Sequence, residues 1–442
     1  MMHTPTRFQR RRTAWSLVLG VVVLASCTSD TPTTPSEPPT PTDVSWTHCP
    51  GVFAPDIAWF AVQDGTGPWR RVTETSHTFS FHLDSGRAAV AYTDASPLPY
   101  SSTYVRFFTA GELRAIQPLC DRRAFSPAEG KRISGSISGL GPLDEADIAL
   151  GRGTAYVSGP ASTDEPVGFT LSGLESAAAD LIAVKHLRCT SPSTCTAPPA
   201  MIIRRGIDPP NESTLPPLDF TDASESFELV SRTLTIGNLV GGETFAASET
   251  FQTATTTVGV TLMNKTDGSA NAVSARIAYY TLPNDRQLSG DVSRLYISTR
   301  LPAATRELIA EVRGSGDEAV ALGPALPSVS ITAAQQSGFT TIHAEVPNQG
   351  TFVTWGAEYI QRGVVGIYVR ISSGYSRSGM VNVGVPSFAG SSGWSSEWGL
   401  RKGVPTSWTV FGLDMDPVSI ENSLAPSFLR LRIATRFGML TP

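Results

Sequence analysis

Short segments in which apolar and polar residues alternate account for most of the chain from Ala58 onward. Phe79, Phe81 and Leu83, for example, alternate with Ser80 and His82, which is the pattern of a strand with one buried face. No long segment has the 3.6-residue period of an amphipathic helix. We therefore expect one short helix, at residues 109–116, and strands at residues 58–63, 69–75, 78–83, 88–93, 104–109, 132–140, 146–150, 154–157, 167–171, 180–186, 227–239, 256–263, 275–282, 292–299, 328–332, 340–346, 351–360, 364–371, 380–385, 407–413 and 428–435.

The composition supports an all-β fold. Charged residues make up 17% of the 442 residues, and the chain contains 39 Gly and 33 Pro. Helical bundles and coiled coils are richer in charge and poorer in turn residues. We predict several β-sandwich domains in tandem, after a disordered leader and stalk. The expected segments are a leader (1–27), a Thr/Pro-rich linker (28–45), a small β domain (46–124) and β-sandwiches at 132–219, 220–324 and 325–442, of which the last two could form one larger domain.

The segments ISGSISGL, DIALG, GFTLSGL and DLIAVKHL follow one another between residues 132 and 188. Their order and their small apolar positions resemble the carboxypeptidase-regulatory, or transthyretin-like, β-sandwich modules of exported bacterial proteins. This resemblance implies a fold for the segment, and it implies no activity.

The segment 1–27 has the pattern of an export signal. Basic residues between Arg7 and Arg12 precede an apolar run from Ala14 to Ala25, which is shorter than the ~20 residues of a spanning helix. Leu24-Ala25-Ser26-Cys27 resembles the lipobox of bacterial lipoproteins. The resemblance implies that Cys27 receives a diacylglyceryl group and becomes the first residue of the mature protein; the alternative is an ordinary secretory leader with a chance cysteine.

Lipidation of Cys27 would make membrane lipid a partner of the chain and place it in the bacterial cell envelope. Residues 28–45 contain many prolines and almost no large apolar side chains, so we expect a semi-rigid stalk in extended polyproline geometry. Thr28, rather than Asp, follows the cysteine. In the lipoproteins that the leader resembles, this favours the outer membrane, where the host has one.

The remaining cysteines, Cys49, Cys120, Cys189 and Cys195, are even in number. In an exported chain such cysteines usually form disulfides. The short loop from 189 to 195 indicates a local pair, which leaves 49 and 120 to bracket the first folded segment. A zinc site is the alternative, but no CxxC is present and the histidines are scattered, so we predict no metal site.

The charge balance argues against nucleic acid as a partner. Acidic residues number 39 against 34 basic ones, and without Arg7, Arg10, Arg11 and Arg12 of the leader 30 basic residues remain, for a net charge of −9. Proteins that bind nucleic acids are usually basic.

Motifs for catalysis are few. The GxSxG, GxGxxG and P-loop patterns are absent from the sequence, and we predict no cofactor. His77 and His82 are five positions apart, and an odd offset in one strand would place them on opposite faces. Asp144–Asp147 and Asn264–Gly268 offer oxygen atoms but not the spacing of a calcium loop. A glycosidase would need two convergent carboxylates, and the candidates are Asp64, Glu112, Glu358, Glu397 and Asp414.

Trp394 and Trp398 lie in the Ser/Gly-rich segment Gly390–Gly399, with Tyr375 and Trp408 as candidate neighbours. Exposed indoles stack on sugar rings or anchor partner proteins, so both tryptophans are candidates for ligand contact. The alternative, which the usual burial of large aromatic residues favours, is that the two rings close one end of a sandwich.

These observations favour a lipid-anchored envelope lipoprotein with a binding or structural role. Glycans and other envelope proteins are the candidate partners, and no catalysis is asserted. The alternative is an envelope hydrolase that acts on carbohydrates through a carboxylate pair, with β modules as accessories. A third interpretation is a structural component without a small ligand.

Overall fold

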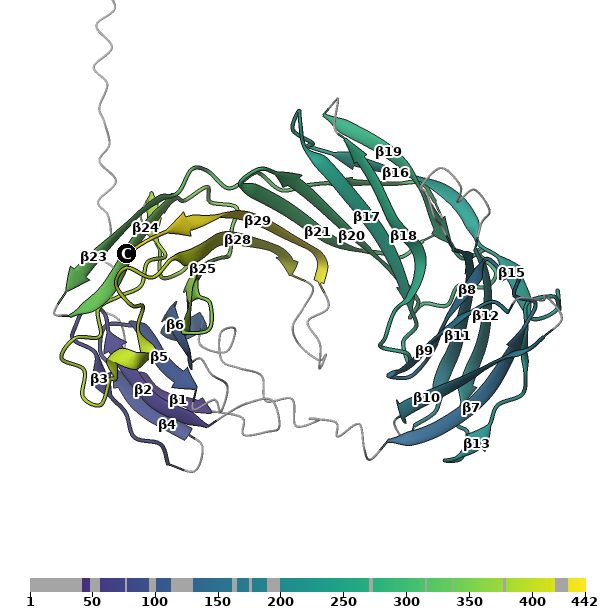
Figure 1. Cartoon of the computed structure of the whole chain (residues 1–442), viewed down its shortest axis with the longest axis horizontal. Helices are drawn as coiled ribbons and strands as arrows, with labels where there is room; N and C mark the ends of the chain where they lie inside the picture. The colour runs from purple at the N-terminus through teal and green to yellow at the C-terminus, as the bar shows by residue number, and fades with distance from the viewer. Residues whose placement is uncertain are drawn as a thin grey trace, which may run out of the picture. The chain divides into compact units, whose positions relative to one another are not determined.

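The computed structural model describes residues 42–47, 56–75, 78–94, 101–112, 130–160, 165–174, 177–188, 199–269, 273–314, 316–336, 338–376, 379–417 and 428–442, all within the compact unit Thr40–Pro442. Within these ranges the regular elements are β-strands and two 3-10 turns, η1 (Ala110–Glu112) and η3 (Ser396–Trp398) (Figure 1). The predicted all-β class is confirmed. No helix in this part of the chain is long and apolar enough to cross a membrane.

Twelve strands form the largest sheet, and every neighbouring pair is antiparallel except β26 and β6. Strands from the segments 46–124, 220–324 and 325–442 are hydrogen-bonded neighbours here, a pairing that the tandem-domain prediction did not include. In spatial order the sheet contains β18 (Val260–Ser269), β17 (Thr244–Gln252), β20 (Val292–Leu301), β21 (Ala304–Val312), β29 (Phe428–Leu440), β28 (Thr406–Pro417), β25 (Thr354–Gln361), β26 (Val365–Ser372), β6 (Ser101–Thr109), β5 (Arg87–Asp94), β2 (Ile57–Asp64) and β3 (Arg70–Arg71).

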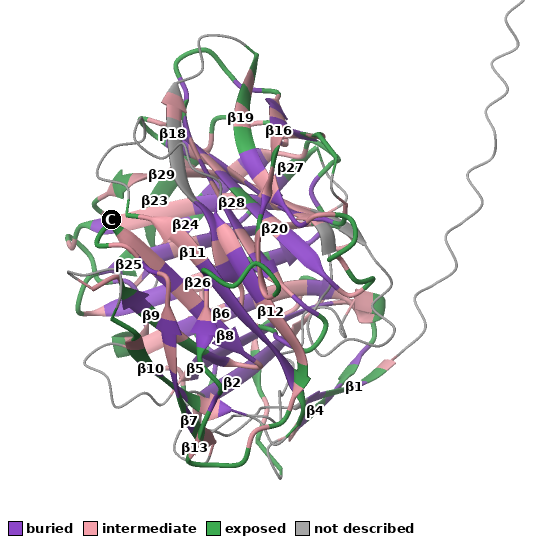
Figure 2. Cartoon of the chain, turned by 90° about the vertical axis from the view of Figure 1, so that its right-hand side faces the viewer, coloured by how far each residue is buried: buried purple, intermediate pink, exposed green. Residues whose placement is uncertain are grey.

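The alternation along each strand separates the two faces of this sheet. We call face A the one that carries Leu308 of β21 and Val369 of β26, and face B the one that carries Ile309 and Tyr368 at the adjacent positions. Every second residue of β21 is buried, in the order of face A. Purple buried and pink half-buried segments accordingly alternate along the strands in Figure 2.

Three small sheets pack on the large one. Sheet β19-β16-β22 covers face A over β17, β20 and β21, and sheet β23-β24-β27 covers face A over β25, β26 and β28. On face B, β1 and β4 cover β2, β5 and β6. The bounds are β19 (Ser274–Thr281), β16 (Val230–Gly237), β22 (Glu318–Ala321), β23 (Ser330–Gln336), β24 (Phe339–Pro347), β27 (Met380–Asn382), β1 (Thr42–Thr47) and β4 (Thr78–Leu83).

Residues 131–228 form a β-sandwich, because Ile133 and Phe169 of one sheet share a core with Ile148 and Leu181 of another. The resemblance of residues 132–188 to transthyretin-like modules stays a prediction. One sheet contains β10 (Val167–Leu174), β7 (Lys131–Ser138), β13 (Ser213–Thr214) and β14 (Leu218–Asp219), and the other β15 (Ser226–Glu228), β12 (Ala200–Ile207), β11 (Ala179–Leu187), β8 (Asp144–Leu150) and β9 (Gly153–Ser158).

Several local predictions need correction. Strands β1, β12, β13, β14, β17, β21 and β22 were not expected, and β1 begins at Thr42, inside the predicted linker. Residues 264–268, predicted as a break, lie within β18. The predicted helix at 109–116 is a 3-10 turn over Ala110–Glu112, and its remainder lies outside the described residues. All five cysteines also lie outside them, so the lipidation of Cys27 and the pairs Cys49–Cys120 and Cys189–Cys195 stay predictions.

Candidate functional site

Trp394 and Trp398, the two tryptophans predicted as ligand contacts, lie in the connection between β27 and β28. The ring centroids of the two are 5.6 Å apart. Trp394 also lies 4.7 Å from Trp59 and 4.5 Å from Phe388, measured between ring centroids. Trp59 and Phe388 are 1% and 3% exposed. The structure therefore brings the two tryptophans together and packs both, half-buried, against the core under face A.

The backbone of this connection is also tied to the large sheet. The indole nitrogen of Trp59 donates to the carbonyl of Ser392 at 3.2 Å, and the hydroxyl of Thr103 donates to the carbonyl of Trp398 at 3.3 Å. Tyr375 lies 5.2 Å from Phe107, between ring centroids, and Trp408 packs against the same core. This geometry fits rings that close the end of the core, while ligand contact stays untested.

The five carboxylates considered for a glycosidase lie in separate settings. Most of them bind groups of the protein itself. Asp64 accepts hydrogen bonds from the backbone and hydroxyl of Ser85, and Glu112 accepts from Thr109, Ser372 and the Gly374 backbone. Asp414 forms an ion pair with Arg432 at 2.8 Å. Glu358 is half-buried on β25, and Glu397 is exposed in η3.

The hydrogen bonds at Glu112 also determine its ionisation. Burial opposes the charged form, but donors from Ser372, Thr109 and Gly374 together hold the pKa of Glu112 below its usual value. A general acid in a glycosidase needs a raised pKa. Glu112 therefore has a structural role, because its hydrogen bonds join the end of β6 to the end of β26. It gives no support to the hydrolase alternative.

The remaining polar candidates also contact the protein. Asp144 accepts from the Gly141 backbone at 2.7 Å, and His82 pairs with Asp43 at 2.7 Å. His77 lies outside the described residues. Among those residues no three His, Cys, Asp or Glu side chains form a group that could hold a metal ion.

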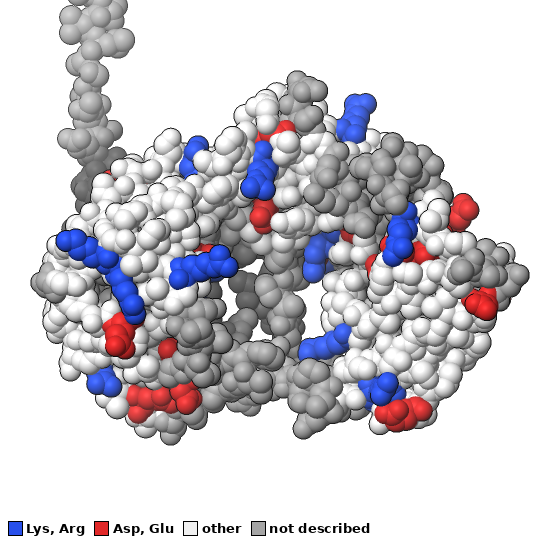
Figure 3. Space-filling view, viewed as in Figure 1, with Lys and Arg blue, Asp and Glu red and all other residues white. Residues whose placement is uncertain are grey.

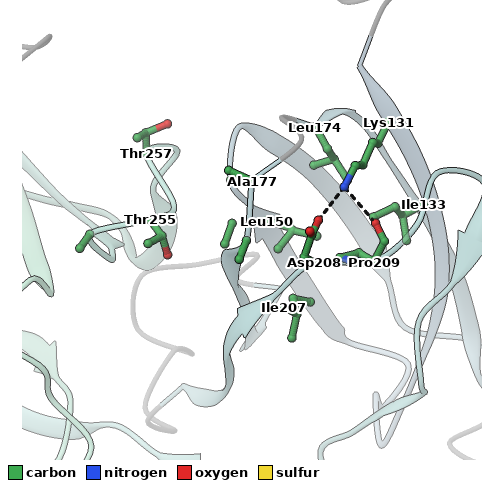
Figure 4. Close-up of a pocket in the computed structure, with 14 residues that line it drawn as sticks. Lys131, Ile133, Leu150, Leu174, Ala177, Ile207, Asp208, Pro209, Thr255 and Thr257 are labelled. Carbon is green, nitrogen blue, oxygen red and sulfur yellow. Dashed lines mark hydrogen bonds and ion pairs between the residues drawn. The ribbon is translucent and has the colours of Figure 1, made fainter.

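A cavity of about 250 Å³ lies at one end of the sandwich formed by residues 131–228. Its apolar wall includes Ile133, Leu150 and Leu174, and Thr255 stands across from them (Figure 4). The ammonium group of Lys131 donates to the Asp208 carboxylate at 2.6 Å and to the Pro209 carbonyl at 3.2 Å. At this volume the cavity is smaller than most ligand sites, which measure ~300–1,000 Å³. The charge of Lys131 is already balanced by the Asp208 carboxylate.

A second group of residues lies on face B, where β6 and β26 run parallel and in register. Tyr104-Val105-Arg106 and Tyr368-Val369-Arg370 are the same tripeptide, and identical residues are direct neighbours across the two strands. Tyr92 of β5 extends the row, because its ring lies 5.0 Å from that of Tyr104, which in turn lies 5.0 Å from that of Tyr368. We call these three rings the tyrosine ladder.

The two arginines beside the ladder lie against aromatic rings. The Arg106 guanidinium is 5.8 Å from the ring centroid of Trp46 and donates to the Tyr92 hydroxyl at 3.5 Å. Arg370 lies 5.4 Å from the ring centroid of Phe411. Gly356 of β25 lies between Arg370 and Phe411. A β-carbon added to Gly356 would lie only 2.2 Å from the Phe411 ring, so this ring fills the space above the glycine. Arg370 is exposed, and the part of the chain that the structure describes provides it with no ion pair.

The comparisons with known proteins add no assignment: neither the protein-family models nor the curated proteins that were searched match this sequence.

Sequence reasoning missed the arginines and the tyrosine ladder. The signal was present, because Tyr-Val-Arg occurs at 104–106 and again at 368–370. Both strands were predicted, at 104–109 and 364–371. The pairing of strands so distant in the sequence was not predicted, and only the parallel register places the two copies side by side.

Proposed function

We propose that this protein is a lipid-anchored lipoprotein of the bacterial cell envelope that binds ligands with its β-sheet body. The observation that carries the proposal is the leader, in which a basic segment, a short apolar run and Leu24-Ala25-Ser26-Cys27 follow in the order of a lipoprotein signal. Two acyl chains hold a protein on a bilayer far longer than one does. In this proposal membrane lipid is the partner of Cys27, and the outer membrane is the destination where the host has one.

The described body supports a binding role through face B. Aromatic and arginine side chains are the residue types most enriched where proteins bind partners. Here Tyr104 and Tyr368 are half-buried beside Arg106 and Arg370 on face B of β6 and β26, while Tyr92 of β5 is buried under β1 and β4. Strands that pack on a rigid sheet hold such side chains in fixed positions, which lowers the entropy lost on binding.

Fractionation of cells that produce the full chain tests the anchor. We expect the wild-type protein in washed membranes, released by detergent but not by high salt, because acyl chains rather than charges hold it there. The variant Cys27→Ser should appear in the soluble exported fraction, and the matched control Thr28→Ser should stay in the membranes. A wild-type protein that is soluble without detergent would overturn the proposal.

A further inference from the structure

Strand β23 is the last strand of the sheet β23-β24-β27, and among the described strands it is paired with β24 alone. Ile342 of β24 lies opposite Ala333, and its N–H donates to the Val385 carbonyl at 3.2 Å, on the side away from β23. Opposed residues of an antiparallel pair point their backbone groups either toward each other or away from each other. The N–H and C=O groups of Ala333 therefore point away from β24, and by alternation so do those of Ile331 and Gln335. We call this side of β23 its free edge.

The free edge has none of the usual protections against pairing with another strand. Ser330 and all residues from Thr332 to Gln336 are exposed, and only Ile331 is half-buried. The pairing with β24 has no bulge, and the strand contains no charged residue and no proline. Proteins use charges, prolines, bulges and covering segments to keep an edge strand from pairing. Without them, the backbone groups of β23 are available to a further strand.

The other end strands of the described sheets are protected. Strands β3, β13, β14, β15 and β27 are only two or three residues long. Strands β9 and β10 lie against each other, because Leu174 of β10 fills the space beside Gly153 of β9. The remaining end strands, β1, β4, β18, β19 and β22, carry the ionisable side chains Asp43, His82, Lys265, Asp267, Arg276 and Glu318. Among the described end strands, β23 is therefore the one that is long, neutral and uncovered.

Charge does not select the partner of this edge. Over the face of the molecule drawn in Figure 3, basic and acidic side chains are interspersed. A charged partner would need a broad field of one sign to attract it. A neutral strand with a free edge of its own is the partner that fits, and β23 of a second copy is such a strand.

A second copy of β23 matches the free edge over its whole length. A two-fold axis at Ala333 aligns residues 330–336 of the two copies in antiparallel order, with Ile331 of one copy opposite Gln335 of the other. These are the positions whose N–H and C=O groups point outward, so donors meet acceptors across the axis. Every opposed pair consists of neutral side chains, and alanine faces alanine at the axis, so no like charges oppose the pairing.

We propose that two copies of this protein pair through their free edges, so that the sheet β23-β24-β27 of one copy continues into that of the other. The contact of one strand is small beside a standard interface of ~1,600 Å², so the dimer is weak and reversible in dilute solution. Copies held in one membrane by the proposed anchor would meet at a higher effective concentration. The pairing itself needs no anchor.

Sedimentation velocity of the exported chain with Cys27→Ser tests the dimer. This variant cannot be acylated at residue 27, so the result does not depend on the anchor. We expect the sedimentation coefficient to rise with protein concentration as monomers pair.

Substitutions at the axis, made in the same chain, locate the contact. Ala333→Lys and Ala333→Glu each place like charges opposite each other, and each should weaken dimerisation at least about tenfold. An equimolar mixture of the two should recover it, because lysine then faces glutamate. Ala278→Lys is the matched control, since Ala278 is an exposed alanine on the end strand β19, and it should change the dimerisation less than about twofold. Unchanged thermal melting of each variant establishes that it is folded.

Three results would overturn the proposal: a monomer at every concentration, undiminished dimerisation of Ala333→Lys, or no association in the mixture of the two folded variants. Undiminished dimerisation would mean that the copies meet at another surface. Failure of the pairing is distinguishable from failure of the anchor. A monomeric protein with Cys27 acylated leaves the lipoprotein proposal standing, and a dimer of a protein that is not acylated leaves the pairing standing.

Discussion

The two small sheets on face A cover cores of different chemistry. Under β19-β16-β22 the core is mainly aliphatic, and it contains the buried ion pair of Glu243 and Arg306 and the isolated carboxyl of Glu249. Under β23-β24-β27 the core is rich in tryptophan and tyrosine, and Gln361 is its buried polar anchor. The comparison teaches that the core between one sheet and its covering layer can be stabilised either by a buried ion pair or by a neutral amide. The stability of the two cores should therefore respond differently to mutation and to pH.

The largest effect should come from removing one partner of the ion pair. Arg306 donates to both carboxylate oxygens of Glu243, and its remaining nitrogen donates to the Gly323 carbonyl at 2.8 Å. Arg306→Met leaves a buried carboxylate without its cation, and we expect a loss of about 3–5 kcal/mol in the free energy of unfolding. Urea denaturation measures it.

The double variant Glu243→Gln/Arg306→Met sharpens this result. It removes both charges, so it should be clearly more stable than Arg306→Met alone. Equal stability of the two variants would show that the charge of Glu243 is not what destabilises the single variant.

The neutral anchor of the other core should matter somewhat less. The Gln361 amide donates to the Arg401 carbonyl at 2.9 Å and to the Thr406 hydroxyl at 3.0 Å, and its oxygen accepts from the Arg401 backbone at 2.8 Å. Gln361→Leu leaves these groups unpaired and should cost about 2–3 kcal/mol. Because no charge is involved, the loss should be the same at pH 5 and pH 8; a loss that varies strongly with pH would end the contrast between the two cores.

Glu249 should give the core under β19-β16-β22 a pH dependence. Burial raises its pKa to about 8, and a hydrogen bond from the Tyr280 backbone offsets this only in part. Below pH 4.5 the carboxyl is protonated in both the folded and the unfolded chain, so it has no effect. Between pH 4.5 and about 8 the unfolded chain loses this proton and the folded one keeps it, so stability falls as the pH rises.

Glu249→Gln removes this pH-dependent loss. It should stabilise the protein by about 2 kcal/mol at pH 6 and by almost nothing at pH 4, as measured by urea denaturation at both values. If Glu249→Gln stabilises the protein equally at both pH values, the difference in stability between glutamate and glutamine at this position comes from packing and not from protonation.

The smallest effect should come from Trp394. Its ring contacts Trp59 and Phe388, but its indole nitrogen is buried without a hydrogen-bond partner among the described residues. Trp394→Phe keeps an aromatic ring and removes that unpaired nitrogen, so it should cost less than about 1 kcal/mol. The difference between the fluorescence spectra of wild type and variant reports on Trp394, and its quenching by acrylamide measures how accessible this ring is to solvent. Complete shielding from acrylamide would remove Trp394 from the candidate ligand contacts.

The sequence predicts well what depends on neighbouring residues. Phe79, Phe81 and Leu83 identify β4, and its observed bounds are the predicted ones. Prediction fails where long-range packing decides. Strand β21 carries Arg306 and Glu311, and such charges argue against a buried strand until Glu243, from a distant part of the sequence, is placed beside Arg306. The candidate site depends on a parallel pairing of β6 with β26, which alternation within one strand cannot reveal.

The central claim, that a lipid on Cys27 anchors this sheet protein in the envelope, is tested most directly by the mass of the amino-terminal peptide of the protein isolated from membranes. The account predicts a peptide that begins at Cys27 and carries a diacylglyceryl group. An unmodified Cys27, or a chain that still contains residues 1–26, would contradict it.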